Sequence, residues 1–138
     1  GYTGFYKEEN CVWLTEKVCV TQTDIRNIQL AKAAIAAGIQ ILLNEKGIIY
    51  KDVKRLILAG GFGTYLNKES AARIGLIPKE LLPVTQAVGN AAGEGAISAA
   101  ISKEAREQAK KIREHMYYIE LSMHPEFSDA YMDLMYFE

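Results

Sequence analysis

Apolar positions along the chain follow first a short strand pattern and then a long helical repeat. Residues 10–20 hold two short apolar segments on either side of Thr15-Glu16-Lys17, which predicts two β-segments. Thr21, with Asp24 three positions later, has the pattern of a capping box, and a helix is predicted from there to Gly47. Two apolar rows run along this helix, so we expect it to be buried between layers. The first row comprises Ile25, Ile28, Ala31, Ile35, Ile39 and Leu42, and the second comprises Leu30, Ala34, Ala37 and Ile41.

The next part of the chain alternates strands with helices. Lys54 to Ala59 is short, branched and apolar and leads into Gly60-Gly61, which predicts a buried, parallel strand. We expect a helix from about Asn67 to Ile74, a weaker strand from Pro83 to Val88, and a further helix capped by Asn90. This order of elements is typical of an α/β layered architecture.

The end of the chain is rich in methionine and aromatic residues. Ser102 is expected to cap a final helix, and the alternation from Tyr117 to Met123 predicts an edge strand. Two interpretations of the tail stay open: it folds back on its own domain, which we favour, or it packs on a partner. The final helix is predicted to turn Ala105, Ala109, Ile112 and Met116 inward, and Phe127, Tyr131 and Leu134 fit one helical face.

Length, composition and charge are those of a globular domain. The 138 residues suffice for one domain, and 49% hydrophobic with 24% charged residues argue against disorder. Sixteen basic and seventeen acidic residues give a net charge of −1, which disfavours nucleic acid or an anionic membrane as the main partner. The chain has neither an apolar run of about 18 residues nor a signal peptide pattern, so we expect a cytoplasmic protein.

Few residues that carry chemistry stand at a useful spacing. Cys11 and Cys19 lie eight positions apart, which fits no metal site, so we expect two half-buried thiols in a reducing compartment. His115 and His124 lack a partner at the spacing of metal ligands. The sequence therefore assigns no catalytic and no metal-binding residue.

The strongest signal for ligand binding is the segment Leu58-Ala-Gly-Gly-Phe-Gly63. A predicted strand ends there in three glycines, and ligands of parallel α/β sheets bind at the carboxyl ends of strands. Glycine adopts positive φ and offers bare backbone to a ligand, so the segment fits either a binding loop or a tight turn. It lacks both the lysine of a P-loop and the glycine spacing of a dinucleotide fingerprint.

Two further segments carry weaker signals. One face of the long helix presents Gln29 and Lys32 beside Ala33 and Ala36, which suits a flat polar ring or close packing against a sheet. Residues 88–96 again join a strand end, a glycine and a capped helix, where we favour close packing over phosphate binding.

Three segments, 21–38, 58–66 and 89–96, together resemble one protein family. They contain the strings Asp-Ile-Arg…Ala-Lys-Ala-Ala-Ile, Ala-Gly-Gly-Phe-Gly and Gly-Asn-Ala-Ala-Gly-Glu-Gly-Ala in this order. Over roughly residues 15–138 the chain is similar to the C-terminal part of the reductive activators of corrinoid proteins. These are ATPases of the superfamily of acetate and sugar kinases, heat-shock chaperones and actin.

The resemblance implies a fold and a division of the chain. The expected fold is α/β, a layered half-domain of the actin-like, ribonuclease H-like ATPase fold, over residues 21–101. Residues 1–20 would be β-segments that end a preceding region, and residues 102–138 a C-terminal helix with an aromatic tail.

The resemblance also implies a function. Such activators use ATP, with Mg²⁺, to help return a cobalt(II) corrinoid to cobalt(I), and the electron arrives through an N-terminal iron–sulfur domain. The implied partner is a corrinoid protein or a corrinoid methyltransferase. Chaperone relatives place arginines against adenine where this chain has Ala33 and Thr64, so the ring is expected on Phe62, Tyr65 or aliphatic surface. The implied nucleotide contacts are Gly60, Gly61, Phe62 and Gly63 at the glycine turn, and Gln29 and Lys32 on the long helix.

The phosphate-binding hairpins, catalytic acid and cluster cysteines of such activators have no match in this sequence. We therefore expect a fragment of a longer protein that has no ATPase activity by itself. Two alternatives stay open. One is a non-enzymatic module whose tail mediates dimerisation or docking to a corrinoid protein, and the other is a small-molecule kinase of the same superfamily.

Overall fold

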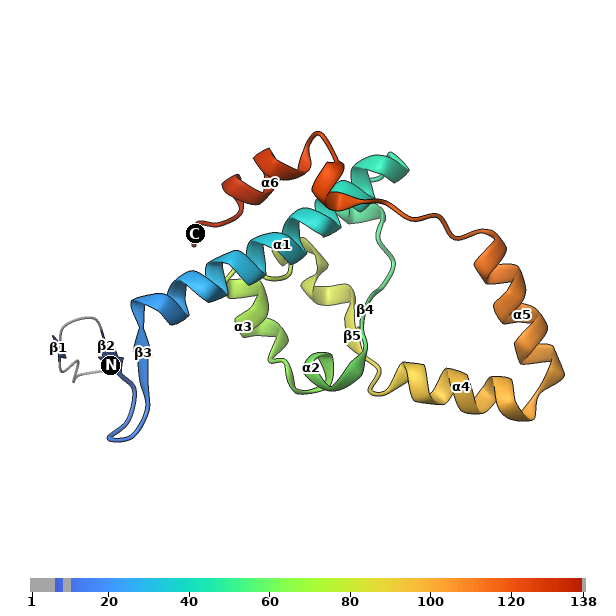
Figure 1. Cartoon of the computed structure of the whole chain (residues 1–138), viewed down its shortest axis with the longest axis horizontal. Coiled ribbons are helices and arrows are strands. Elements are labelled where there is room, and N and C mark those ends of the chain that lie inside the picture. Colours follow the sequence, from blue (N-terminus) through green and yellow to red (C-terminus); the bar gives the residue numbers. More distant parts are fainter. Residues whose placement is uncertain (1–6, 9–10, 138) are drawn as a thin grey trace.

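The structure, a computed structural model, describes residues 7–8 and 11–137 and combines two small sheets with a long helix (Figure 1). Its first elements are β1 (Lys7–Glu8), β2 (Cys11–Trp13), β3 (Cys19–Thr21), α1 (Gln22–Lys46), β4 (Leu56–Leu58) and β5 (Thr85–Ala87). Strands β1, β2 and β3 form an antiparallel sheet in that order, and β4 pairs with β5 in parallel. Helix α1 crosses the molecule above the parallel pair.

The hairpin of β2 and β3 confirms the two predicted β-segments. Its register pairs Cys11 with Thr21 and Trp13 with Cys19. The two cysteines are joined in a disulfide, with their Cα atoms 6.0 Å apart, so the expectation of two thiols is wrong. Spacing along the chain missed this pair because the hairpin, not the sequence separation, brings the cysteines onto one face. Residues 1–6 and 9–10, which the expected β-region includes, lie outside the described residues.

Helix α1 begins and ends as predicted. The Thr21 hydroxyl accepts a hydrogen bond from the Asp24 amide at 3.1 Å, and the Asp24 carboxylate accepts one from the Thr21 amide at 2.9 Å. The carboxylate also accepts a hydrogen bond from the Thr21 hydroxyl at 2.7 Å, and this bond is the main cause of the lowered pKa of Asp24. At the other end, Gly47 closes the helix with a φ of +64°.

The buried face of α1 differs from the predicted one. Ile28, Ile35 and Leu42 of the expected inward row are exposed. A stripe of mostly small residues is buried instead, because small side chains let other segments approach closely: a Cβ at Gly38 would lie 3.4 Å from the Leu121 side chain. The helix is nevertheless covered on two sides, by α6 on one and by the core that Ile39 contacts on the other, so it lies between layers as expected (Figure 1). The buried residues are Lys32, Ala33, Ala36, Ala37, Gly38 and Ile41.

The chain between the parallel strands is mostly helical. Its elements are α2 (Gly60–Tyr65), α3 (Lys68–Arg73) and the 3₁₀ helix η2 (Lys79–Val84), and a further 3₁₀ helix, η1 (Tyr50–Asp52), precedes β4. As predicted, Asn67 caps α3, and its side-chain oxygen accepts a hydrogen bond from the Ser70 amide at 2.7 Å. Helix α2 was not expected, since the glycines that suggested a turn form its first residues.

The core of this part lies between β4, α3 and the segment that follows α3. Leu56 and Leu58 of β4 and Ile39 of α1 pack against it. Ile57 points away from the core and is exposed, so β4 is less buried than predicted. The buried members of the core are Ala71, Leu76, Ile77 and Leu81.

Two helices, α4 (Ala91–Ile101) and α5 (Lys103–Glu114), extend away from this core and meet at a corner at Ser102 (Figure 1). Asn90 and Ser102 cap them as predicted. The inward face predicted for α5 is wrong: none of its residues is buried, and Ile112 and Met116 are exposed. The amphipathic pattern of α5 therefore has no apolar partner within the described chain.

The tail folds back on α1, as favoured from the sequence. It contains the 3₁₀ helix η3 (Leu121–Met123) and helix α6 (Phe127–Asp133), and α6 packs along α1. The rings of Phe127 and Tyr131 stack with centroids 5.7 Å apart. The edge strand predicted from Tyr117 to Met123 does not form, because η3 interrupts the alternation and Glu120 caps it through the Ser122 amide. No helix among the described residues is long and apolar enough to cross a membrane.

Candidate nucleotide site

The carboxyl ends of β4 and β5 meet at one edge of the parallel pair. The Val88 amide donates to the Leu58 carbonyl at 3.0 Å, and the Gly60 amide donates to the Gly89 carbonyl at 2.6 Å. Gly60 and Gly89 both adopt positive φ, at +84° and +65°. Hence the two glycine segments that the sequence singled out lie side by side, at the edge where parallel α/β sheets bind ligands.

The three glycines at the start of α2 differ in whether, and why, the fold requires a glycine at their position. Gly60 needs its positive φ, which side chains rarely adopt. Gly63 needs space, because a Cβ there would lie 2.9 Å from Leu58 Cβ and 3.0 Å from the Leu58 carbonyl carbon. Gly61 has neither constraint, since a Cβ would meet nothing within 4 Å. Contacts within the described part of the chain therefore do not explain why residue 61 lacks a side chain.

Aromatic side chains flank the open backbone at Gly60 and Gly61. Phe62 is 70% exposed, and Tyr65, one turn further along α2, is also exposed. The Thr64 hydroxyl is turned toward the helix and donates to the Gly60 carbonyl at 2.8 Å. An exposed ring beside bare backbone can stack on a planar base while the backbone approaches the attached sugar.

Gln29 and Lys32 are not brought to this edge. Both lie on α1, and α3 stands between α1 and α2 (Figure 1). Lys32 is 3% exposed, and its ammonium donates to the carbonyls of Leu134 at 2.6 Å and Tyr136 at 2.5 Å. The structure thus unites Gly60 to Gly63 and places the two helix residues elsewhere; their expected contact with a nucleotide is not tested by this geometry, and the site proposed below is built from the glycine edge alone.

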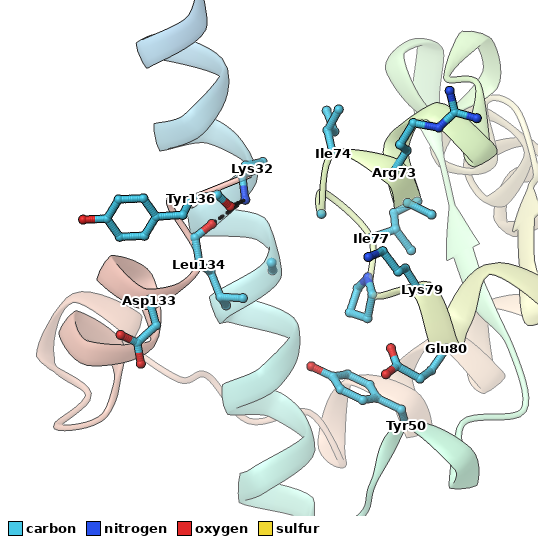
Figure 2. A pocket seen from close by; sticks show the side chains of 14 residues that line it. Lys32, Tyr50, Arg73, Ile74, Ile77, Lys79, Glu80, Asp133, Leu134 and Tyr136 are labelled. Atoms are coloured by element: carbon cyan, nitrogen blue, oxygen red, sulfur yellow. Dashed lines mark hydrogen bonds between the residues drawn. The ribbon is translucent and has the colours of Figure 1, made fainter. Parts of the chain in front are cut away.

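A cavity of about 260 Å³ lies beside Lys32, between α1, the end of α3 and the tail (Figure 2). Arg73 and Lys79 line it together with Glu80 and Asp133. Burial, and then the charge of Glu80, raises the pKa of Tyr50, which also lines the cavity. Sequence reasoning missed this cavity because its lining comes from four separate segments that no spacing connects.

The fold and the glycine edge define the class of protein. A parallel pair that ends in a glycine-rich helix start, followed by a second capped helix, fits half of an actin-like ATPase domain, the class that the family match supports. Within that class the chain belongs to the family described as "C-terminal domain of RACo the ASKHA domain", whose model matches residues 5–138.

Known relatives agree with this assignment. Corrinoid activation enzyme RamQ of Eubacterium limosum is 40% identical over 116 residues, which are 83% of this chain and 19% of RamQ. A [Co(II) methylated amine-specific corrinoid protein] reductase of Methanosarcina barkeri is 34% identical over 59 residues, 43% of this chain and 11% of that protein. A solved reductive activator for corrinoid, iron–sulfur protein superposes with a TM-score of 0.76 at 38% identity, over 85% of this chain and 19% of that one. The chain thus spans about a fifth of the length of the relatives that it covers best.

Proposed function

We propose that this chain forms the adenosine side of an ATP-dependent reductive activator, which restores cobalt(I) in a corrinoid protein or corrinoid methyltransferase of the cytoplasm. Two observations support the proposal. The relatives are named for corrinoid activation and for reduction of a Co(II) corrinoid protein. The glycine edge also offers the bare backbone and exposed aromatic ring that a purine nucleoside needs.

The observation that carries the proposal is Gly61. Gly60 is required by its φ and Gly63 by the approach of Leu58, but nothing among the residues that the structure describes requires a glycine between them. The open space over Gly60 and Gly61 fits a nucleoside, with the base against Phe62. Two cysteines cannot hold a four-cysteine cluster, so an iron–sulfur centre is no part of what we propose for this chain.

ATP would couple this half to a second half that holds the phosphates. When bound, ATP with Mg²⁺ supplies charge that can bridge the two halves. Shifting a two-state element from 1:99 to 99:1 takes about 5.5 kcal/mol of differential binding, which contacts on both sides of one nucleotide can provide. The residues of this chain would bind the nucleoside, so closure of the two halves around ATP would depend on Gly60 to Gly63. No bond of ATP is broken at these residues.

The test replaces Gly61 by alanine in the full-length activator. Because alanine favours a helix over glycine by up to about 1 kcal/mol, Gly61→Ala should keep or raise stability while its methyl group blocks the nucleoside. We expect ATP affinity by calorimetry to fall at least tenfold, together with ATP-dependent formation of cobalt(I).

Gly95→Ala is the matched control. Gly95 lies in α4, and a Cβ there would also meet nothing within 4 Å. It should gain the same helix propensity and bind ATP as the wild type does. Unchanged ATP affinity in Gly61→Ala would remove the basis of the proposal.

A further inference from the structure

The last residues of the tail cross α1 and are held there by Lys32. We call Leu134–Phe137 the strap. The Lys32 ammonium donates to the strap carbonyls of Leu134 and Tyr136 at 2.6 and 2.5 Å (Figure 2). It also lies 5.2 Å from the centre of the Phe137 ring. A Cβ at Gly75 would lie 3.3 Å from the same nitrogen. The ammonium is thus enclosed between the strap and the loop after α3.

The strap and the lysine stabilise each other. An ammonium that is 3% exposed must replace its water shell with polar partners, or its burial costs several kcal/mol. Two charge-assisted hydrogen bonds and the face of an aromatic ring provide that replacement. In return, the strap is tied to α1 across 102 residues of sequence.

Side-chain burial along the strap is uneven, since Leu134 and Met135 are half-buried whereas the last two residues are exposed. Tyr136 is 75% exposed and Phe137 is 43% exposed, and Ala130 is the buried residue of α6. The Lys32 ammonium gives the strap two hydrogen bonds from α1, and we therefore expect the attachment to depend on this group.

A second attachment lies at the opposite end of α6. Asn44 donates to the Glu126 carboxylate at 3.2 Å, and the Glu45 carboxylate lies 3.1 Å from the His124 ring. These contacts join the far end of α1 to the start of α6. If the hydrogen bonds from Lys32 to the strap broke, these contacts would still hold the start of α6 on α1, and α6 could rotate about this end.

We propose that the strap is a lid, latched by Lys32, that opens over the cavity while α1 and the core stay folded. Leu134 and Tyr136 form one wall of the cavity, opposite Arg73 and Lys79 (Figure 2). Opening removes that wall and turns the Lys32 ammonium toward the cavity. Lys32 is then a positioning residue for the lid and is separate from the candidate nucleotide site at Gly61.

The experiment compares three variants of the full-length protein by hydrogen exchange. The reporters are the Leu134 and Met135 amides, which donate to the carbonyls of Ala130 and Met132. Lys32→Met keeps the volume of the side chain but removes the latch, and should speed exchange of these amides more than tenfold. Phe137→Ala removes only the ring, and should speed it about two- to fivefold.

Tyr136→Ala is the control, because Tyr136 contributes its carbonyl and not its exposed ring. It should exchange at the wild-type rate, and in all variants the α1 amides should keep their protection. Wild-type exchange at Leu134 and Met135 in both Lys32→Met and Phe137→Ala would overturn the latch. A second result would also overturn it: in Phe137→Ala, which keeps the buried lysine, the α1 amides would lose their protection together with the strap amides.

Nucleotide binding separates this inference from the proposed function. The latch predicts that Lys32→Met binds ATP as the wild type does. A loss as large as that of Gly61→Ala would place Lys32 in the nucleotide site and overturn its assignment to the lid. If Gly61→Ala bound ATP normally while exchange of the strap still depended on Lys32, only the proposed nucleotide site at Gly61 would be refuted.

Discussion

At the scale of single residues, Gly63 is a glycine that the fold requires for lack of space. A methyl group there would press on the Leu58 Cβ at 2.9 Å and on its backbone, which is rigid. Gly63→Ala should therefore lower the free energy of unfolding by about 1–3 kcal/mol, as overpacking does, whereas Gly61→Ala should not. Urea denaturation measures both. Equal stability of Gly63→Ala and wild type would show that α2 does not pack on β4 as described.

Some residue roles could be predicted from sequence and others could not. The strand end and its glycines located the candidate site, because glycines after an apolar strand are a local pattern. Which glycine serves the fold depends on φ and on nearby atoms, which only the structure supplies. Helical spacing likewise grouped Lys32 with Gln29, but its partners Leu134 and Tyr136 lie more than 100 positions away.

At the scale of elements, the capping box makes the start of α1 sensitive to acid. The Thr21 hydroxyl and amide lower the pKa of Asp24 in the folded state. Stability from this carboxylate is fully present above its unfolded pKa of about 3.9 and is lost as pH falls through the lower folded pKa. We expect Asp24→Asn to flatten the fall in stability below about pH 4. Denaturation curves at pH 3 and pH 6 test this, and an equal slope in both proteins would contradict it.

Element ends were easier to predict than element faces. Thr21, Asn67, Asn90 and Ser102 all cap helices as predicted, because a cap is decided within four residues. Much of the first apolar row of α1 and the inward face of α5 were predicted wrongly, whereas Ala37 and Ile41 of the second row of α1 are buried as expected. Periodicity shows that a helix has an apolar face, but packing decides whether that face is covered.

The exposed helices α4 and α5 give a stability prediction. Ile101 is 82% exposed and contributes little apolar burial. Ile101→Ser in this chain should change the free energy of unfolding by less than about 0.5 kcal/mol, as surface substitutions do. A loss of more than 1 kcal/mol in urea denaturation would mean that α4 is covered.

At the scale of the whole molecule, the proposed function assigns to this chain one side of a nucleotide site. We predict that the purified 138-residue chain binds ATP weakly and hydrolyses none, because phosphate contacts must come from a second half. Phosphate release assays of this chain and of the full-length activator make the comparison. Robust ATP hydrolysis by the 138-residue chain would contradict the proposal that the phosphate contacts come from a second half.

The most direct test of the nucleoside seat is photolabelling of the full-length activator with 8-azido-ATP, followed by peptide mapping. The account predicts that the label falls on the peptide with Phe62 and Tyr65, the exposed rings beside Gly61, and that excess ATP suppresses it. An ATP-sensitive label on α1 around Lys32, with none on α2, would contradict it.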